Sequence, residues 1–128
     1  MLKNLPKKIL VVDDEEEIVV RLRNILKRAN YDVISTTKGR EVLELAKNHQ
    51  PDLIILDILM PDMEGSEVAS VLAQDPSTAN IPILFLTGVI ITKEEESLLG
   101  RKAGKHYLMA KPTTAKELLD MVREVLSS

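Results

Sequence analysis

Short apolar runs alternate along this chain with segments whose apolar residues recur every three to four positions. Three runs of four consecutive apolar residues, at Ile9–Val12, Leu53–Leu56 and Ile83–Leu86, are typical of strands that are buried on both faces of a parallel sheet. Two mixed runs, Tyr31–Thr36 and His106–Ala110, predict further strands, and the polar character of the first suits a sheet edge. This alternation predicts an α/β fold with a parallel sheet.

Helical periodicity fills the intervals between the first four predicted strands. A helix follows the first strand, a second helix spans Gly39–Asn48, and a third follows the turn "MPDMEG". In that turn, Gly65 is expected at positive φ, the conformation that glycine adopts most readily. The apolar positions expected to face the core are Ile18, Leu22, Ile25, Leu26 and Ala29 in the first helix, some of Val42, Leu43, Leu45 and Ala46 in the second, and Val68, Val71 and Leu72 in the third.

One further helix is expected before the last strand and another after it. The earlier one opens on Glu94–Glu96 and has a short apolar stripe. The last one begins with a capping box, in which Thr114 and Glu117 satisfy backbone N–H groups of the first turn. The expected core positions are Leu98, Leu99 and Ala103 in the former, and Ala115, Leu118, Leu119, Val122 and Leu126 in the latter.

Composition limits the class of protein. With 128 residues, 45% of them hydrophobic, the chain is expected to form one domain, residues 1–128, with no separate output domain. No apolar run approaches the roughly 20 residues of a membrane span, no secretory signal opens the chain and cysteine is absent, so we expect a cytoplasmic protein with no membrane contact. A net charge of -3 argues against direct nucleic-acid binding.

Polar residues stand where the predicted strands end. Asp13 and Asp14 follow the first strand, and Asp57 ends the third. Thr87 follows the fourth strand and Lys111 the fifth. Because the carboxyl ends of parallel strands lie along one edge of the sheet, we expect these five side chains to meet there.

Three carboxylates at one edge repel one another, by about 1 kcal/mol per pair at 4 Å in water and roughly 4 kcal/mol at an effective dielectric constant near 20. Hard oxygen ligands without sulfur or paired imidazoles favour Mg²⁺ as the neutralising ion. A carboxylate nucleophile, Asp57, would suit a phosphoryl group, with the Lys111 ammonium and the Thr87 hydroxyl beside it.

Four motifs, "ILVVDDE", "LIILDILMPDMEG", "DPSTANIPILFLTG" and "MAKP", resemble in order and spacing the receiver domain of bacterial two-component response regulators. The resemblance runs from Lys8 to about Leu126. It implies a flavodoxin-like (βα)5 fold, a doubly wound parallel five-stranded sheet with strand order 2-1-3-4-5.

The resemblance also implies roles for single residues. Asp57 matches the phosphoacceptor, and Thr87 and Lys111 match the pair that contacts the phosphoryl group. The implied Mg²⁺ ligands are Asp14 directly, Asp13 through water, the Asp57 carboxylate and the backbone carbonyl of Leu59. Domains of this kind catalyse only their own phosphorylation and dephosphorylation.

The partners implied are a histidine kinase or a histidine phosphotransfer protein as donor, and a downstream protein or output domain. Family members also often pair through helix 4, strand 5 and helix 5, which makes that face the candidate surface for a homodimer, although the sequence does not give the oligomeric state.

Two departures from the family pattern concern switching and phosphoryl lifetime. Leu108 stands where receivers commonly carry an aromatic residue, and strand alternation turns the adjacent Tyr107 to the opposite face. Leu59 and Val89 are apolar at positions where polar side chains in relatives help to orient the hydrolytic water. The hypothesis is that these two residues slow autodephosphorylation.

Other interpretations stay open. Asp13 and Asp14 could simply cap the first helix, and Asp57 alone could be a turn residue. A degenerate receiver that acts only as an interaction or dimerisation module would explain Leu108, but the intact set of acids, threonine and lysine argues against it. A Mg²⁺-dependent aspartyl phosphatase would want a second acid where this chain has Leu59.

Overall fold

Five parallel strands form one sheet in the order β2-β1-β3-β4-β5, as the sequence predicted. The structure is a computed structural model, and it describes residues 5–87, 106–110 and 114–127. The strands are β1 (Lys8–Val12), β2 (Asp32–Thr36), β3 (Leu53–Asp57), β4 (Ile83–Thr87) and β5 (His106–Ala110).

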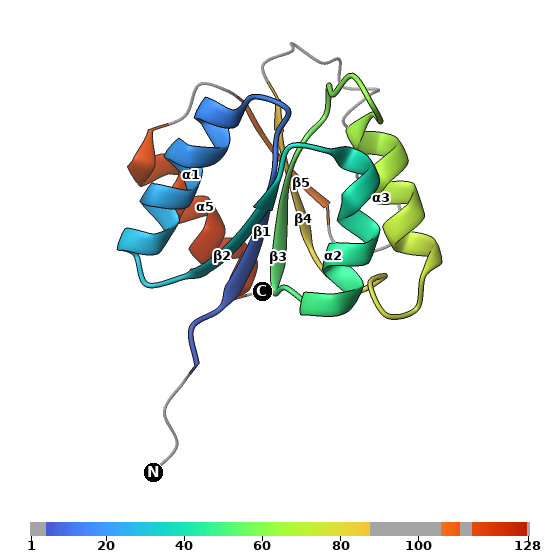
Figure 1. The fold of residues 1–128 in the computed structure, drawn as a ribbon. Helices are drawn as coiled ribbons and strands as arrows, with labels where there is room; N and C mark the ends of the chain where they lie inside the picture. Colours follow the sequence, from blue (N-terminus) through green and yellow to red (C-terminus); the bar gives the residue numbers. More distant parts are fainter. Residues whose placement is uncertain (1–4, 88–105, 111–113, 128) are drawn as a thin grey trace.

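Helices cover both faces of the sheet (Figure 1). On one face lie α1 (Glu16–Arg28) and α5 (Ala115–Leu126), and on the other α2 (Val42–His49) and α3 (Gly65–Gln74). The second predicted helix is in fact divided: Gly39–Glu41 form a 3-10 turn, η1, and the α-helix follows from Val42. The helix expected around Glu94–Ala103 lies outside the described residues.

Strand alternation divides the core into two apolar clusters. In β1, Leu10 and Val12 join the cluster under α2 and α3, whereas Ile9 and Val11 join the cluster under α1 and α5. Every residue of β3 is buried, which explains the unbroken aliphatic run from Leu53 to Leu56. The sheet is therefore covered on both sides, and its strand ends are the places where polar groups can gather.

The helix stripes differ in detail from those predicted. In α1 the buried positions are Val19, Leu22 and Leu26, while Ile18 and Ile25 are only partly buried. The prediction missed Val19, which stands three residues before Leu22 and so lies on the same face at 3.6 residues per turn.

Similar shifts occur in α3 and α5. In α3, Ala69 is buried and Val71 is only partly so. In α5, Val125 joins Leu118 and Val122 in the core, and Ala115 is exposed. In each helix two predicted positions stay at the centre of the buried stripe, and only positions at its edges differ.

The start of α5 has the predicted capping box. Thr114 Oγ1 accepts a hydrogen bond from the Glu117 N–H (3.1 Å), and Glu117 Oε1 accepts one from the Thr114 N–H (3.0 Å). The bond from the Thr114 N–H lowers the pKa of Glu117 below its usual value. This local signal was strong enough to place the helix start from sequence alone.

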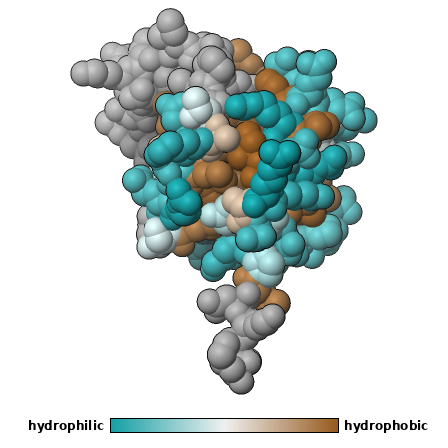
Figure 2. All heavy atoms as spheres, turned by 90° about the vertical axis from the view of Figure 1, so that its left-hand side faces the viewer, coloured by the Kyte–Doolittle hydropathy of each residue, from teal (hydrophilic) through white to brown (hydrophobic). Residues whose placement is uncertain are grey.

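The side formed by α1 and α5 carries apolar side chains between polar rims (Figure 2). Ile18, Ile25 and Met121 belong to the partly buried residues that pack against the cluster beneath these helices, and Val20 is 40% exposed.

In the parts of the chain that the structure describes, no helix is both long and apolar enough for a membrane span.

Candidate functional site

Three aspartates meet at the carboxyl end of the sheet. β1 and β3 are direct neighbours, with Val12 paired to Leu56, so Asp13 and Asp57 leave the sheet side by side. One carboxylate oxygen from each of Asp13, Asp14 and Asp57 lies within 4.8 Å of the other two. Asp13 is 1% exposed and Asp57 5%, whereas Asp14 is exposed. Two of the three aspartates are therefore buried, and solvent reaches the cluster at Asp14.

Asp13 makes hydrogen bonds to the residue before α1 and to the last residue of β2. Its Oδ1 accepts a hydrogen bond from the Glu15 N–H (2.9 Å), and its own N–H donates to the Thr36 carbonyl (3.4 Å). Glu15, not an aspartate, is the N-cap of α1, and it makes no side-chain capping bond. Neither aspartate is therefore the N-cap residue of α1.

Gly65 brings α3 against the strand that ends in Asp57. Its N–H donates to the Ile58 carbonyl at 2.7 Å, and a Cβ on Gly65 would lie 2.5 Å from the Asp57 carbonyl oxygen. The expectation of a positive φ was wrong, because Gly65 is the first residue of α3 and its φ is not in the left-handed region. Glycine is required here by close approach of the backbone.

Asp62 fastens the loop between β3 and α3 to the start of η1. Its Oδ1 accepts from the Gly39 N–H and its Oδ2 from the Arg40 N–H, both at 3.2 Å. The bond from Arg40, followed by that from Gly39, lowers the pKa of Asp62 and favours the carboxylate. Sequence reasoning treated Asp62 only as a turn residue, since nothing in the local pattern indicated a partner more than twenty positions earlier.

Of the remaining predicted site residues, the structure describes Leu59 and the backbone of Thr87. Thr87 is the last residue of β4, one position beyond Leu86, which pairs with Asp57, so its backbone lies at the same edge of the sheet. Lys111 lies outside the described residues. Leu59 stands two residues after Asp57 in the loop and is 52% exposed.

The prediction for β5 is confirmed. Leu108 packs against the cluster under α2 and α3, and Tyr107 packs against the opposite one. The register with β4 is continuous from Ile83–His106 to Thr87–Ala110, so no bulge brings Tyr107 round to the face of Leu108.

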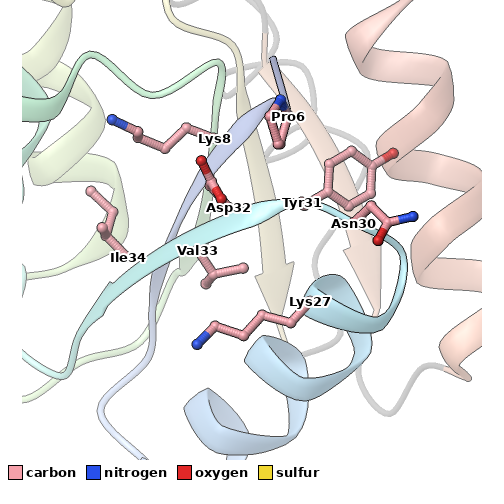
Figure 3. Close-up of a pocket in the computed structure, with 8 residues that line it drawn as sticks. All are labelled: Pro6, Lys8, Lys27, Asn30, Tyr31, Asp32, Val33 and Ile34. Carbon is pink, nitrogen blue, oxygen red and sulfur yellow. The ribbon is translucent and has the colours of Figure 1, made fainter. Parts of the chain in front are cut away.

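A shallow groove of about 640 Å³ runs along β2, near the amino ends of β1 and β2 (Figure 3). Lys8 and Lys27 extend on opposite sides of the strand, and Lys8 Nζ already donates to the His49 carbonyl (3.2 Å). The lining residues are Pro6, Lys8, Lys27, Asn30, Tyr31, Asp32, Val33 and Ile34. Among the eight described residues that line this groove, Asp32 is the only Asp, Glu, His or Cys, so the acidic cluster is the better candidate for a metal site.

Comparison with known proteins points to one family. A family model of the response regulator receiver domain matches residues 9–123. The alkaline phosphatase synthesis transcriptional regulatory protein PhoP of Bacillus subtilis is 43% identical over 122 residues, which cover 94% of this chain and 48% of PhoP. The polar-differentiation response regulator DivK of Brucella anthropi is 30% identical over 122 residues, 95% of this chain and 98% of DivK.

Solved structures agree with this result. The chemotaxis response regulator CheY4 of Vibrio cholerae superimposes with a TM-score of 0.83 at 30% identity, covering 94% of this chain and 98% of CheY4. This chain spans about half the length of PhoP and nearly all of DivK. With its sheet order and the match over most of its length, the chain belongs to the response regulator receiver domain family, a family of signalling domains.

Proposed function

We propose that Asp57 accepts a phosphoryl group and that the chain works as a phosphorylation-controlled switch. The observation that carries this proposal is the convergence of Asp13, Asp14 and Asp57, two of them buried, within 4.8 Å of one another. Burying like charges together raises the free energy of the folded state, so such a cluster indicates a bound cation or a role in a reaction. A degenerate receiver that serves only as an interaction module gives no reason to keep this arrangement.

The donor set fits Mg²⁺. It consists of carboxylate oxygens, and the exposed Asp14 leaves one side open to water and an incoming phosphate. We propose Asp13, Asp14, Asp57 and the Leu59 carbonyl as the groups that hold the ion. When bound, Mg²⁺ would supply positive charge against the phosphoryl oxygens.

In the proposed reaction, an Asp57 carboxylate oxygen attacks phosphorus, a P–O bond forms, and the P–N bond to the donor histidine breaks. Burial of Asp57 limits access of water to the acyl phosphate that results. We assign two further roles. The Thr87 hydroxyl donates a hydrogen bond to a phosphoryl oxygen, and the Lys111 ammonium balances the negative charge of the phosphoryl group. The domain would then catalyse its own phosphorylation and later dephosphorylation.

We propose a histidine kinase or histidine phosphotransfer protein as the donor, and a downstream protein or output domain as the receiver of the signal. Residues 1–128 would act as one receiver unit. A homodimer through helix 4, β5 and α5 remains a proposal, of which the structure describes β5 and α5.

One experiment tests the proposed function. The chain is incubated with Mg²⁺ and phosphoramidate, and the intact mass is measured. We expect one phosphate increment on the wild-type chain and none on Asp57→Asn. Asp52→Asn is the matched control, because Asp52 stands at the amino end of the same strand, and it should still gain the increment. If the wild-type chain gains no phosphate increment, or if Asp57→Asn gains one, the result would contradict the assignment.

A further inference from the structure

The loop between β3 and α3 is fastened at two points. At its base, the Gly65 N–H donates to the Ile58 carbonyl at 2.7 Å. Farther along, the Asp62 carboxylate accepts from the N–H groups of Gly39 and Arg40. Asp57 directly precedes this loop and Leu59 lies within it. Both contacts therefore influence the positions of the Asp57 carboxylate and the Leu59 carbonyl.

The segment that Asp62 contacts is itself linked to Asp13. Thr36 Oγ1 accepts from the Lys38 N–H (3.1 Å) and donates to the Glu41 carboxylate, while the Thr36 carbonyl accepts from the Asp13 N–H (3.4 Å). Hydrogen bonds therefore lead from Asp13 through Thr36 to Lys38 and Glu41. The two residues between them, Gly39 and Arg40, are the ones that Asp62 contacts from the loop after Asp57.

Close packing supports the same junction. A Cβ on Gly39 would lie 3.1 Å from Met63 Cβ and 3.2 Å from Met60 Cε. Met60 is 6% exposed and belongs to the core cluster, whereas Asp62 is exposed. Core packing thus holds the methionines on either side of Asp62, and the carboxylate fixes the turn between them. The lowered pKa of Asp62 means that the contacts favour the ionised group.

The geometry points to Asp62 as a positioning residue for phosphoryl acceptance: it sets the loop after Asp57 at a fixed distance from Asp13 and so maintains the spacing of the acidic cluster. This inference rests on the proposed function, and it adds a residue outside the cluster. If Asp62 served stability alone, its loss would resemble the loss of any other carboxylate that binds backbone N–H groups.

The chain contains such a carboxylate at the opposite end of the sheet. Asp52 Oδ2 accepts from the Lys8 N–H at 2.8 Å, a bond of the same type that also joins two distant segments. Asp52→Ala is therefore the matched control for Asp62→Ala. Asp62→Asn, which keeps one oxygen acceptor, is the conservative variant and protects the test against a poorly folded alanine variant.

The experiment compares wild type, Asp62→Ala, Asp62→Asn and Asp52→Ala. Mg²⁺ affinity is measured by NMR titration, the initial rate with phosphoramidate is measured at limiting Mg²⁺, and amide hydrogen exchange is followed at Gly39 and Arg40. We expect Asp62→Ala to weaken Mg²⁺ binding about fivefold, the effect of roughly one hydrogen bond, and to slow phosphorylation by a similar factor. Asp62→Asn should fall between it and wild type, and Asp52→Ala should leave Mg²⁺ affinity unchanged.

Two outcomes overturn the inference. One is an Asp62→Ala variant whose Gly39 and Arg40 amides exchange faster while Mg²⁺ affinity and rate stay at wild-type values. The other is an equal loss of affinity in Asp52→Ala. If the wild-type chain binds Mg²⁺ but gains no phosphate, the proposed function fails and the affinity comparison still decides the role of Asp62. A wild-type chain with no Mg²⁺ affinity overturns both.

Discussion

Asp52 at the amino end of the sheet joins two backbone segments, whereas the three aspartates of the acidic cluster at the carboxyl end lie close to one another. Asp52 accepts from the Lys8 N–H at 2.8 Å, and its own N–H donates to the Lys8 carbonyl at 2.7 Å, so the pair closes a local ring. Asp13 and Asp57 are instead buried beside a third carboxylate.

The comparison shows how one fold can separate stability from function. A carboxylate that accepts backbone N–H groups lowers the free energy of the folded state. Like charges brought together raise that free energy, and only a ligand or a reaction explains their retention. We therefore expect the loss of Asp52 to alter stability alone, and changes in the acidic cluster to alter metal binding and phosphorylation as well.

The largest effect is expected at Gly65. In Gly65→Ala, the new Cβ would meet backbone, the Asp57 carbonyl oxygen at 2.5 Å and Ile58 Cα at 2.8 Å, so the strand end or the helix must move. Overpacking of this kind costs about 2–3 kcal/mol. Urea unfolding should show that loss, and phosphoramidate should label the variant more slowly than wild type.

Gly39→Ala is the control for Gly65→Ala. Its nearest neighbours would lie at 3.1–3.2 Å, and one of them is the flexible end of Met60, so the cost should be smaller. An equal loss of stability in the two variants would show that contact with the Asp57 carbonyl is not what demands glycine at Gly65.

The next effect comes from charge. Asp14→Asn removes one of three acids that lie within 4.8 Å of one another, and Asp14 is exposed, so solvent screens much of the repulsion. Without Mg²⁺, we expect a stability gain of about 1 kcal/mol. With millimolar Mg²⁺, the wild-type chain should melt at a higher temperature, and the variant should gain much less.

Asp32→Asn serves as the matched control, because Asp32 is also an exposed aspartate but stands at the amino end of β2, away from the cluster. It should change neither the melting temperature without metal nor the response to Mg²⁺. Equal responses to Mg²⁺ in both variants would place the ion elsewhere.

A smaller effect concerns the lifetime of the phosphoryl group. Leu59 stands two residues after Asp57 and is 52% exposed, and its aliphatic side chain has no group that could orient a water molecule. In Leu59→Asn, the amide would offer a hydrogen bond to the hydrolytic water, so phosphate loss should speed up roughly fivefold, the rate equivalent of one such bond. Adding Val89→Glu, at a position outside the described residues, should increase the effect; unchanged or slower loss contradicts the hypothesis.

The sequence predicted the sheet well because burial on both faces leaves a plain signal. Continuous apolar runs identified β1, β3 and β4, and the Thr114–Glu117 capping box placed the start of α5. The convergence of the three aspartates followed from topology, since parallel strands end at a common edge.

What the sequence could not supply are contacts between distant loops. Nothing near Asp62 indicates that its partners are Gly39 and Arg40, and the tight approach at Gly65 depends on where α3 packs. Residues at the edges of the helix stripes were also missed, because Val19 and Ile18 are similarly apolar and only packing decides which of them is buried. The placement of Lys111 stays a prediction.

The smallest effect is expected at Gln50, which ends α2 and precedes β3 at the amino end of the sheet. Gln50 has φ 46° and ψ 61°, the left-handed conformation that costs a residue with a Cβ roughly 1 kcal/mol. Its side-chain Nε2 donates to the carbonyls of Ala46 and Lys47 at 3.3 Å each, long bonds that offset part of this cost. Gln50→Gly should therefore stabilise the fold by about 0.5 kcal/mol, measured by urea unfolding. Gln50→Ala keeps the Cβ and loses both bonds, so it should be slightly destabilising. Because the position is remote from the acidic cluster, both variants should take up phosphate at the wild-type rate, and a changed rate would show that the two ends of the sheet are coupled.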